Sequence, residues 1–231
     1  MLDTRLTESP EYAERRAELQ EAEIALMHQR ERVAALRRAL PVGTAVDNYA
    51  FVEGPGRLDD GDVPTRTVRL SELFTSPGRP LVIYQLMYGK AQEEPCPMCT
   101  LWIDGFNGIA HHLAENADFA VAAAADPAPL RAHARSRGWD RLRLLSCGDS
   151  TFKYDLGSEE ADGTQDSAVS VFTLAADGTP RHFYSGRPHL SAAIDQRGID
   201  LLSPLWHLLD LTPQGRGEWY ASLSYDQHQP S

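Results

Sequence analysis

A long repeating pattern of apolar residues occupies the N-terminal part of the chain. From Ser9 to Leu40 most residues are helix formers, and large apolar side chains recur at intervals of seven residues. The recurring positions are Tyr12, Leu19, Leu26, Val33 and Leu40. Pro41 ends the pattern, so we predict a helix of about 30 residues, roughly 45 Å long. Two placements stay open for this helix: it lies along its own domain, or it forms the interface of a dimer.

The middle of the chain alternates short apolar runs with amphipathic stretches. Leu81–Met87, Phe119–Ala125 and Leu142–Leu145 are nearly continuous apolar runs, which is typical of strands buried on both faces of a sheet. Between these runs, Pro97–Glu115 carries an apolar stripe with helical spacing. Asp126–Arg137 begins with an N-cap residue followed by proline, as helices often do. We therefore predict strand, helix, strand, helix, strand over this region.

The following segment has the pattern of an antiparallel hairpin. After one helical turn at Thr151–Leu156, Ala168–Leu174 alternates as a strand does, and Asp177-Gly178 is a strong turn signal before a returning strand at Arg181–Tyr184. A last helix is predicted near Leu190–Gln196. The whole order predicts an α/β fold in which a central mixed β-sheet, part parallel and part antiparallel, is flanked by helices.

Two shifts in composition divide the chain. One lies at Pro41, and the other is a loop rich in glycine, proline and aspartate over Gly54–Pro64, between a short apolar stretch at Asn48–Val52 and a capped helical turn at Ser71–Phe74. We predict an N-terminal helical extension over 1–41, a main domain over 42–198 and a C-terminal extension over 199–231. The last is helical and aromatic in character, so we expect it to pack on the main domain or on a partner subunit.

The charge balance limits the choice of partners. The chain of 231 residues has 22 Lys and Arg against 33 Asp and Glu, which gives a net charge of −11 and a pI near 5.1. Such acidity argues against nucleic acid. No apolar run approaches the ~18 residues that a membrane-spanning helix needs, and the first residues lack the apolar core of a secretory signal. We expect a cytoplasmic protein with no membrane partner.

A pair of cysteines carries the candidate chemistry. Three cysteines do not make a disulfide framework, but Cys96 and Cys99 lie where a predicted strand and loop lead into a helix. The unpaired N–H groups and the positive end of the helix dipole stabilise a thiolate there. We predict that Cys96, nearer the helix end and solvent, attacks a disulfide, and that Cys99 resolves the mixed disulfide.

Other interpretations of the pair stay open at this point. Two adjacent carboxylates, Glu93 and Glu94, oppose thiolate formation, and an inert pair is compatible with the sequence. A zinc site needs further ligands, and Cys147 with His111 or His112 does not complete a standard pattern. We expect no cofactor and assign no metal ligands.

Residues around the cysteines are candidates for a pocket. Tyr88 lies at the end of the predicted strand, where ligands gather in open α/β sheets, and Pro97 starts the helix. Trp102 lies one turn beyond Cys99, where it either packs over the site or belongs to the core.

The chain resembles a known family at this point. The order of elements with Cys-Pro-Met-Cys at the first core helix resembles the thioredoxin superfamily, and the motif resembles the glutaredoxin form. The segments RRALPVGTAVDNYAF, LVIYQLMYG, SCGDSTFKYDLG and LTPQGRGEWYASLSY resemble a bacterial thioredoxin-like family named as domain of unknown function 899. The resemblance implies a thioredoxin-like fold over nearly the whole chain, with the long N-terminal helix and the C-terminal extension as additions.

The resemblance also implies an activity and its alternatives. It implies a thiol-disulfide oxidoreductase whose partner is a protein with a thiol or disulfide, or a small-molecule thiol, in a chain that forms a homodimer if the long helix is an interface. Thioredoxins carry a cis-proline opposite the cysteines, and Val169 is expected at that position here. Cys96-Pro97 also matches the Cys-Pro step of peroxiredoxins, although Glu93 replaces their threonine, so a thiol peroxidase is an alternative. A non-catalytic binding or assembly module, or a metal site at the cysteines, is the remaining alternative.

Overall fold

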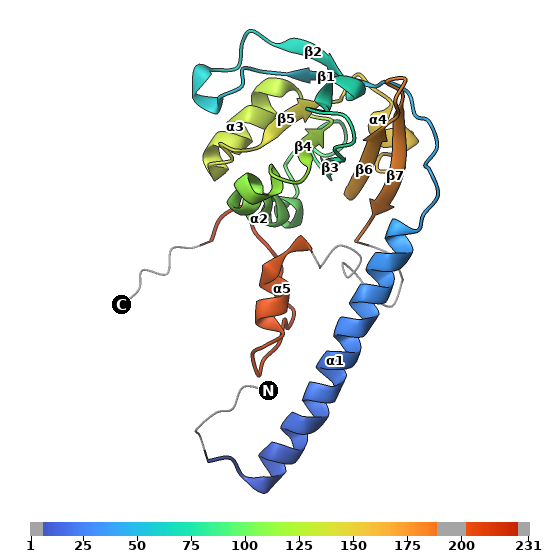
Figure 1. Cartoon of the computed structure of the whole chain (residues 1–231). Coiled ribbons are helices and arrows are strands. Elements are labelled where there is room, and N and C mark those ends of the chain that lie inside the picture. The colour runs from blue at the N-terminus through green and yellow to red at the C-terminus, as the bar shows by residue number, and fades with distance from the viewer. Residues whose placement is uncertain (1–6, 189–201, 226–231) are drawn as a thin grey trace. The chain divides into compact units, whose positions relative to one another are not determined.

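The chain folds into two units. The computed structural model describes residues 7–188 and 202–225, and the chain divides into Met1–Val42 and Gly43–Ser231. The first unit holds the long helix α1, and the second holds the sheet with the helices that follow it along the chain (Figure 1).

The long N-terminal helix forms where the seven-residue pattern predicts it. Helix α1 spans Pro10–Arg38. Ser9 caps it, because the Ser9 Oγ accepts a hydrogen bond from the N–H of Tyr12 at 3.1 Å, and Pro10 lies in the first turn, where no amide hydrogen is required. None of the residues of α1 is buried.

A mixed sheet of seven strands forms the centre of the second unit. Its order is β2-β1-β5-β4-β3-β6-β7. The strands are β1 (Ala50–Glu53), β2 (Arg66–Arg69), β3 (Leu81–Leu86), β4 (Asp118–Ala123), β5 (Arg143–Ser146), β6 (Ala168–Leu174) and β7 (Pro180–Gly186). The neighbours β3, β4 and β5 are parallel, whereas β6 runs antiparallel to β3, and β1 runs antiparallel to β5. The predicted α/β class with a mixed sheet is therefore confirmed.

Helices connect the strands in the predicted order. They are α2 (Pro97–Leu113), α3 (Pro127–Arg137), α4 (Phe152–Asp155) and α5 (Pro204–Leu209). Helices α2 and α3 make the crossovers between the parallel strands, as parallel pairing requires. The helix predicted near Leu190–Gln196 lies outside the described residues.

The central strands are buried on both faces, which explains their continuous apolar runs. On β3, Tyr84 and Leu86 enter one core cluster together with Cys96 and Cys99, and we call this cluster the cysteine-side core. Leu81 and Ile83 of the same strand enter a second cluster on the other face. Because successive side chains of a strand point to opposite faces, both sets must be apolar.

The segment before the parallel strands differs from the sequence-based prediction. The loop after Asn48–Val52 is not a boundary between separate segments. It connects β1 and β2, which form a hairpin on the edge of the sheet, and Val52 pairs with Ser146 of β5. The turn predicted at Ser71–Phe74 is a 3₁₀ turn at Leu70–Leu73, in which the Glu72 carboxylate accepts from the Arg69 N–H at 2.6 Å. The hairpin escaped prediction because β2 buries only Val68.

The C-terminal extension contributes to the same core. Trp206 of α5 and Ala221 are buried within the cysteine-side core. Trp219 lies with its ring centroid 5.7 Å from that of Trp206 and 6.3 Å from that of Tyr225. The aromatic character of this segment thus reflects packing within the second unit.

Candidate functional site

Cys96 lies where the chain passes from a loop into helix α2. It is the N-cap residue, in an extended conformation. The Cys96 N–H donates to the carbonyl oxygen of Met87 at 3.0 Å, and the Cys96 carbonyl accepts from the N–H of Thr100 at 3.0 Å. Pro97 occupies the first helical position, where its missing N–H leaves no bond unmade. These contacts hold the cysteine at the positive end of α2.

The loop that leads to Cys96 is pinned to the end of β4. The N–H of Ala125 donates to the carbonyl of Tyr88 at 2.9 Å. Gly89, next in the chain, has φ of +99°, and a Cβ there would lie 2.2 Å from the backbone nitrogen of Ala125. Glycine is therefore required by both conformation and close approach, and it fixes the entry to the helix.

The two thiols have opposite tendencies to ionise. A hydrogen bond from the Cys99 thiol lowers the pKa of Cys96 to about 6, with help from the N–H groups of Cys99 and Met98, and against the effects of burial and of the Asp166 charge. Burial, together with the neighbouring Cys96, raises the pKa of Cys99 well above its usual value. At neutral pH the pair is a Cys96 thiolate that accepts from a Cys99 thiol. Asp166, which the sequence did not indicate, is the charge that raises the pKa of Cys96.

The two cysteines differ in exposure. Cys96 is 9% exposed and Cys99 1% exposed, and both are free thiols. Cys96 is thus the more accessible of the two.

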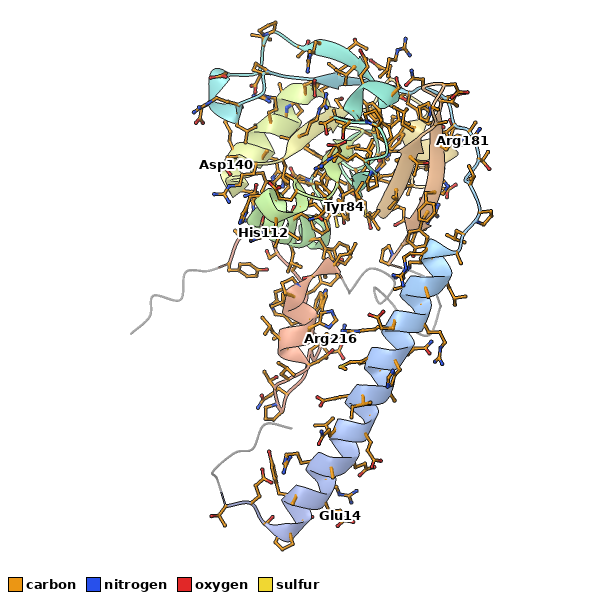
Figure 2. The ribbon with its side chains drawn as sticks, in the orientation of Figure 1. Glu14, Tyr84, His112, Asp140, Arg181 and Arg216 are labelled. Atoms are coloured by element: carbon orange, nitrogen blue, oxygen red, sulfur yellow. The ribbon has the colours of Figure 1, made fainter. Side chains whose placement is uncertain are left out.

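Tyr84 of β3 lies behind the thiols. Its ring packs against Trp102 and Phe106 of α2, and Figure 2 shows it in the interior between the sheet and this helix. In the part of the chain that the structure describes, its hydroxyl makes no hydrogen bond of normal geometry. Burial raises the pKa of Tyr84, and the nearby Cys99 adds to this. The phenol is thus a neutral group facing the buried thiol.

A buried lysine lies near the same thiol. Lys153 of α4 is 1% exposed, and its Nζ donates to the carbonyl of Leu86 at 3.0 Å and to that of Asp166 at 3.3 Å. Burial lowers the pKa of Lys153, whereas Cys147 and Cys99 act in the other direction. The ammonium therefore ties the end of β3 to the segment before β6. Sequence reasoning missed this residue, although it is one of only two lysines and lies inside the SCGDSTFKYDLG segment.

The other side chains predicted for the site fall into two groups. Trp102 is 1% exposed and belongs to the cysteine-side core, so its position is that of a core residue. Tyr88 and Val169 are half-buried and pack against the same core, with Val169 paired to Tyr84 across β3 and β6. Pro97 starts α2. The structure thus places Tyr88 and Val169 at the margin of the cysteine-side core.

A shallow cavity of about 450 Å³ adjoins the residue before Cys96. Pro95, Tyr88 and His133 are among the residues that line it. His133 Nε2 lies 3.1 Å from Thr100 Oγ1 of α2, and burial lowers the pKa of His133, so its imidazole is neutral at pH 7. Sequence reasoning did not indicate His133, because α3 is far from the cysteines along the chain.

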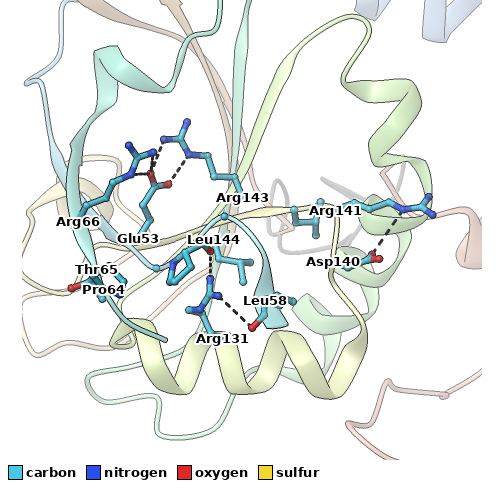
Figure 3. A pocket seen from close by; sticks show the side chains of 14 residues that line it. Glu53, Leu58, Pro64, Thr65, Arg66, Arg131, Asp140, Arg141, Arg143 and Leu144 are labelled. Atoms are coloured by element: carbon cyan, nitrogen blue, oxygen red, sulfur yellow. Dashed lines mark hydrogen bonds and ion pairs between the residues drawn. The ribbon is translucent and has the colours of Figure 1, made fainter. Parts of the chain in front are cut away.

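A larger cavity of about 550 Å³ lies elsewhere, and Figure 3 shows it. It is lined by residues of β1, the β1–β2 loop, α3 and β5, and no cysteine is among them. The guanidinium of Arg131 donates to the carbonyls of Pro55, Arg57 and Gly61 at 2.7 to 3.1 Å. Arg131 is therefore engaged in holding the hairpin loop, and Arg66 and Arg143 pair with Glu53.

The third cysteine is placed for packing. Cys147 is buried, its Sγ donates to the carbonyl of Ala123 at 3.2 Å, and burial raises its pKa to about 12. Over 7–188 and 202–225, no three His, Cys, Asp or Glu side chains gather as a metal ligand set. In the same ranges, no helix is both long and apolar enough to cross a membrane.

Fold and site together define a class of protein. A parallel β3-β4-β5 unit joined to an antiparallel hairpin, with a Cys-X-X-Cys pair at the start of the helix after β3, is a thioredoxin-like fold with its dithiol at the usual structural position. The chain belongs to the family described as "Bacterial protein of unknown function (DUF899)", whose model matches residues 1–229.

Solved structures that are similar to this chain include peroxiredoxins and a putative thioredoxin reductase. AhpC of Enterococcus faecalis is 12% identical, with 70% of this chain and 87% of that chain covered and a TM-score of 0.47. Reduced Prx3 of Vibrio vulnificus in complex with H₂O₂ is 17% identical, with 71% and 97% covered and a TM-score of 0.48. The reduced 2-Cys peroxiredoxin of Plasmodium vivax is 13% identical, with 70% and 91% covered and a TM-score of 0.46. No curated protein matches the chain.

Proposed function

We propose that this protein is a thiol-disulfide oxidoreductase in which Cys96 is the nucleophile and Cys99 is the resolving thiol. One observation carries the proposal: Cys96 is the N-cap residue of helix α2, and a hydrogen bond from the buried Cys99 thiol lowers its pKa to about 6. At pH 7 most of Cys96 is then thiolate, which is the reactive form.

The exchange proceeds in two steps. The Cys96 thiolate attacks one sulfur of a substrate disulfide, so that an S–S bond forms to Cys96 and the other substrate sulfur leaves as a thiolate. Cys99, after losing its proton to water, then attacks Cys96 Sγ, which closes the Cys96–Cys99 disulfide and releases the second substrate thiolate. The substrate gains two electrons and the protein loses two.

The structure supports an order in which Cys99 ionises late. Part of what raises the pKa of Cys99 is the neighbouring Cys96. Once the Cys96 sulfur is bonded to substrate it carries no charge, so this part disappears and Cys99 ionises more easily. The Lys153 ammonium, held among Leu86 and Asp166 carbonyls, then favours the Cys99 thiolate by its charge.

A single-turnover experiment tests the assignment. The pre-reduced protein is mixed with glutathione disulfide, and the loss of protein thiols is followed by alkylation and mass spectrometry. We expect wild type to lose two thiols per chain, Cys96→Ser to lose none, and Cys99→Ser to stop as a mixed disulfide with glutathione. Cys147→Ser is the matched control and should react as wild type does.

The same assay separates the alternatives. Unchanged reaction in Cys96→Ser contradicts the assigned nucleophile. Oxidation of the pair by hydrogen peroxide, but not by glutathione disulfide or by protein disulfides such as those of insulin, would instead make the protein a thiol peroxidase. A pair that reacts with neither oxidant would leave a binding module.

A further inference from the structure

Helix α1 carries its charges in two opposite halves. The half from Pro10 to Glu23 has five glutamates against two arginines, a net charge of −3. The half from Ile24 to Arg38 has four arginines against one glutamate, a net charge of +3. The glutamates are Glu11, Glu14, Glu18, Glu21 and Glu23, and the arginines are Arg30, Arg32, Arg37 and Arg38. The helix is thus a rod with an acidic end and a basic end.

The dipole of the helix itself does not account for this division. Acidic residues near a helix N-terminus and basic residues near its C-terminus are stabilising only within the first and last turns. In α1 the acidic half continues to Glu21 and Glu23, at the middle of the helix. Arg15 and Arg16 pair with Glu18 and Glu8, and the net charge of each half still offers a complement to a partner of opposite polarity.

The same helix exposes a row of large apolar side chains. Tyr12, Leu19, Leu26 and Leu36 are 59%, 57%, 52% and 66% exposed, and the first three follow the seven-residue interval. A helix of 29 residues is about 44 Å long, and its stability as an isolated element is marginal, because most helical stability in proteins comes from packing of an apolar face.

We propose that α1 is a docking surface for α1 of a second copy of this chain, and that the two helices pair antiparallel. Only this orientation places each acidic half against a basic half, whereas a parallel pair would oppose like charges along its whole length. An antiparallel pair has a two-fold axis perpendicular to the helices, which is the symmetry of the commonest homodimers.

The sequence of α1 fits such a pair about its own midpoint. With the two-fold axis at Ile24, the centre of Pro10–Arg38, Glu18 lies opposite Arg30 of the second copy. Tyr12 then lies opposite Leu36, Leu26 opposite Ala22 and Leu19 opposite Gln29, so this arrangement covers part of the exposed apolar row.

Two charge-reversed variants of the full chain test the proposal by sedimentation velocity at low ionic strength. The first carries Glu14→Lys, Glu18→Lys and Glu21→Lys, which makes α1 basic throughout. The second carries Arg30→Glu, Arg32→Glu and Arg38→Glu, which makes it acidic throughout. We expect wild type to be a dimer at micromolar concentration and each variant to dissociate, with a dissociation constant raised about tenfold or more.

The decisive experiment mixes the two charge-reversed variants. An equimolar mixture should form a heterodimer, and a chain that carries all six substitutions should dimerise again, which also shows that each variant helix is folded. A monomeric wild type, variants that associate as wild type does, or a mixture that stays monomeric would each overturn the proposal. Because Cys96 and Cys99 are unchanged in every variant, the outcome is independent of the thiol chemistry.

Discussion

At the scale of single residues, the reactivity of Cys96 depends on the hydrogen bond that the Cys99 thiol donates to its sulfur. The rate of alkylation by iodoacetamide should follow the thiolate fraction, rising with pH and reaching half its maximum near pH 6. Cys99→Ala removes the donor and should move this midpoint upward, whereas Cys99→Ser keeps a hydroxyl donor and should move it less. Rates measured from pH 4 to 10 on a Cys147→Ala background check this. A midpoint that is the same in the Ala and Ser variants would contradict the role of the donor.

Lys153 gives a second prediction at this scale. Lys153→Met removes a buried ammonium that bonds two carbonyls, and the cost of leaving those acceptors unpaired is about 1–3 kcal/mol of unfolding free energy. The variant should also resolve the mixed disulfide more slowly, because the Cys99 thiolate loses a nearby positive charge.

The matched control for Lys153 is the other lysine of the chain. Lys90 pairs with Glu159, whose side chain is 8% exposed, so Lys90→Met should also cost about 1–3 kcal/mol of unfolding free energy, but the mixed disulfide should resolve at the wild-type rate. Urea unfolding and stopped-flow resolution of the glutathione mixed disulfide measure the two effects. Equal resolution rates in Lys153→Met and wild type would show that the lysine is structural alone.

At the scale of elements, helix α3 holds the edge hairpin through one arginine. Arg131 is 4% exposed and donates to carbonyls of the loop between β1 and β2, as Figure 3 shows in part. Arg131→Met should therefore lower the unfolding free energy by about 1–3 kcal/mol, since it removes several hydrogen bonds from a buried guanidinium to the carbonyls of this loop.

A neighbouring arginine controls for this prediction. Arg135 pairs with Asp62 at the surface and its side chain is 35% exposed, so Arg135→Met should unfold at nearly the same urea concentration as wild type. Urea unfolding measures both variants, and hydrogen exchange of β1 and β2 amides should rise only in Arg131→Met. Equal losses in the two variants would refute the special role of Arg131.

Elements also show what the sequence could predict. Strands β3, β4 and β5 were predictable because burial on both faces demands continuous apolar runs, and α2 and α3 because of their proline starts. Strand β2 was not, since an edge strand with one buried residue has no such pattern. The cysteine pair was likewise visible in four consecutive residues. The sequence could not predict the roles of Lys153, Asp166 and His133, because only the packing of distant elements brings these residues near the start of α2.

At the scale of the whole molecule, the low pKa of Cys96 sets how readily the protein is oxidised. A stabilised thiolate stabilises the reduced form, because forming the disulfide removes the charge that the helix N-terminus and the Cys99 thiol favour. The reduction potential should therefore be less negative than the roughly −270 mV of thioredoxin.

The pH dependence of the reduction potential gives a more specific prediction. Below pH 6 both thiols are protonated, so oxidation releases two protons with two electrons, and the potential should fall by about 59 mV per pH unit. Above pH 6 Cys96 has already lost its proton and Cys99 has not, so the slope should halve to about 30 mV per pH unit. Equilibration with redox buffers from pH 5 to 8, read by alkylation and mass spectrometry, measures both slopes. A single slope of about 59 mV per unit across this range would mean that Cys96 is an ordinary thiol, and the proposed nucleophile would lose its physical basis.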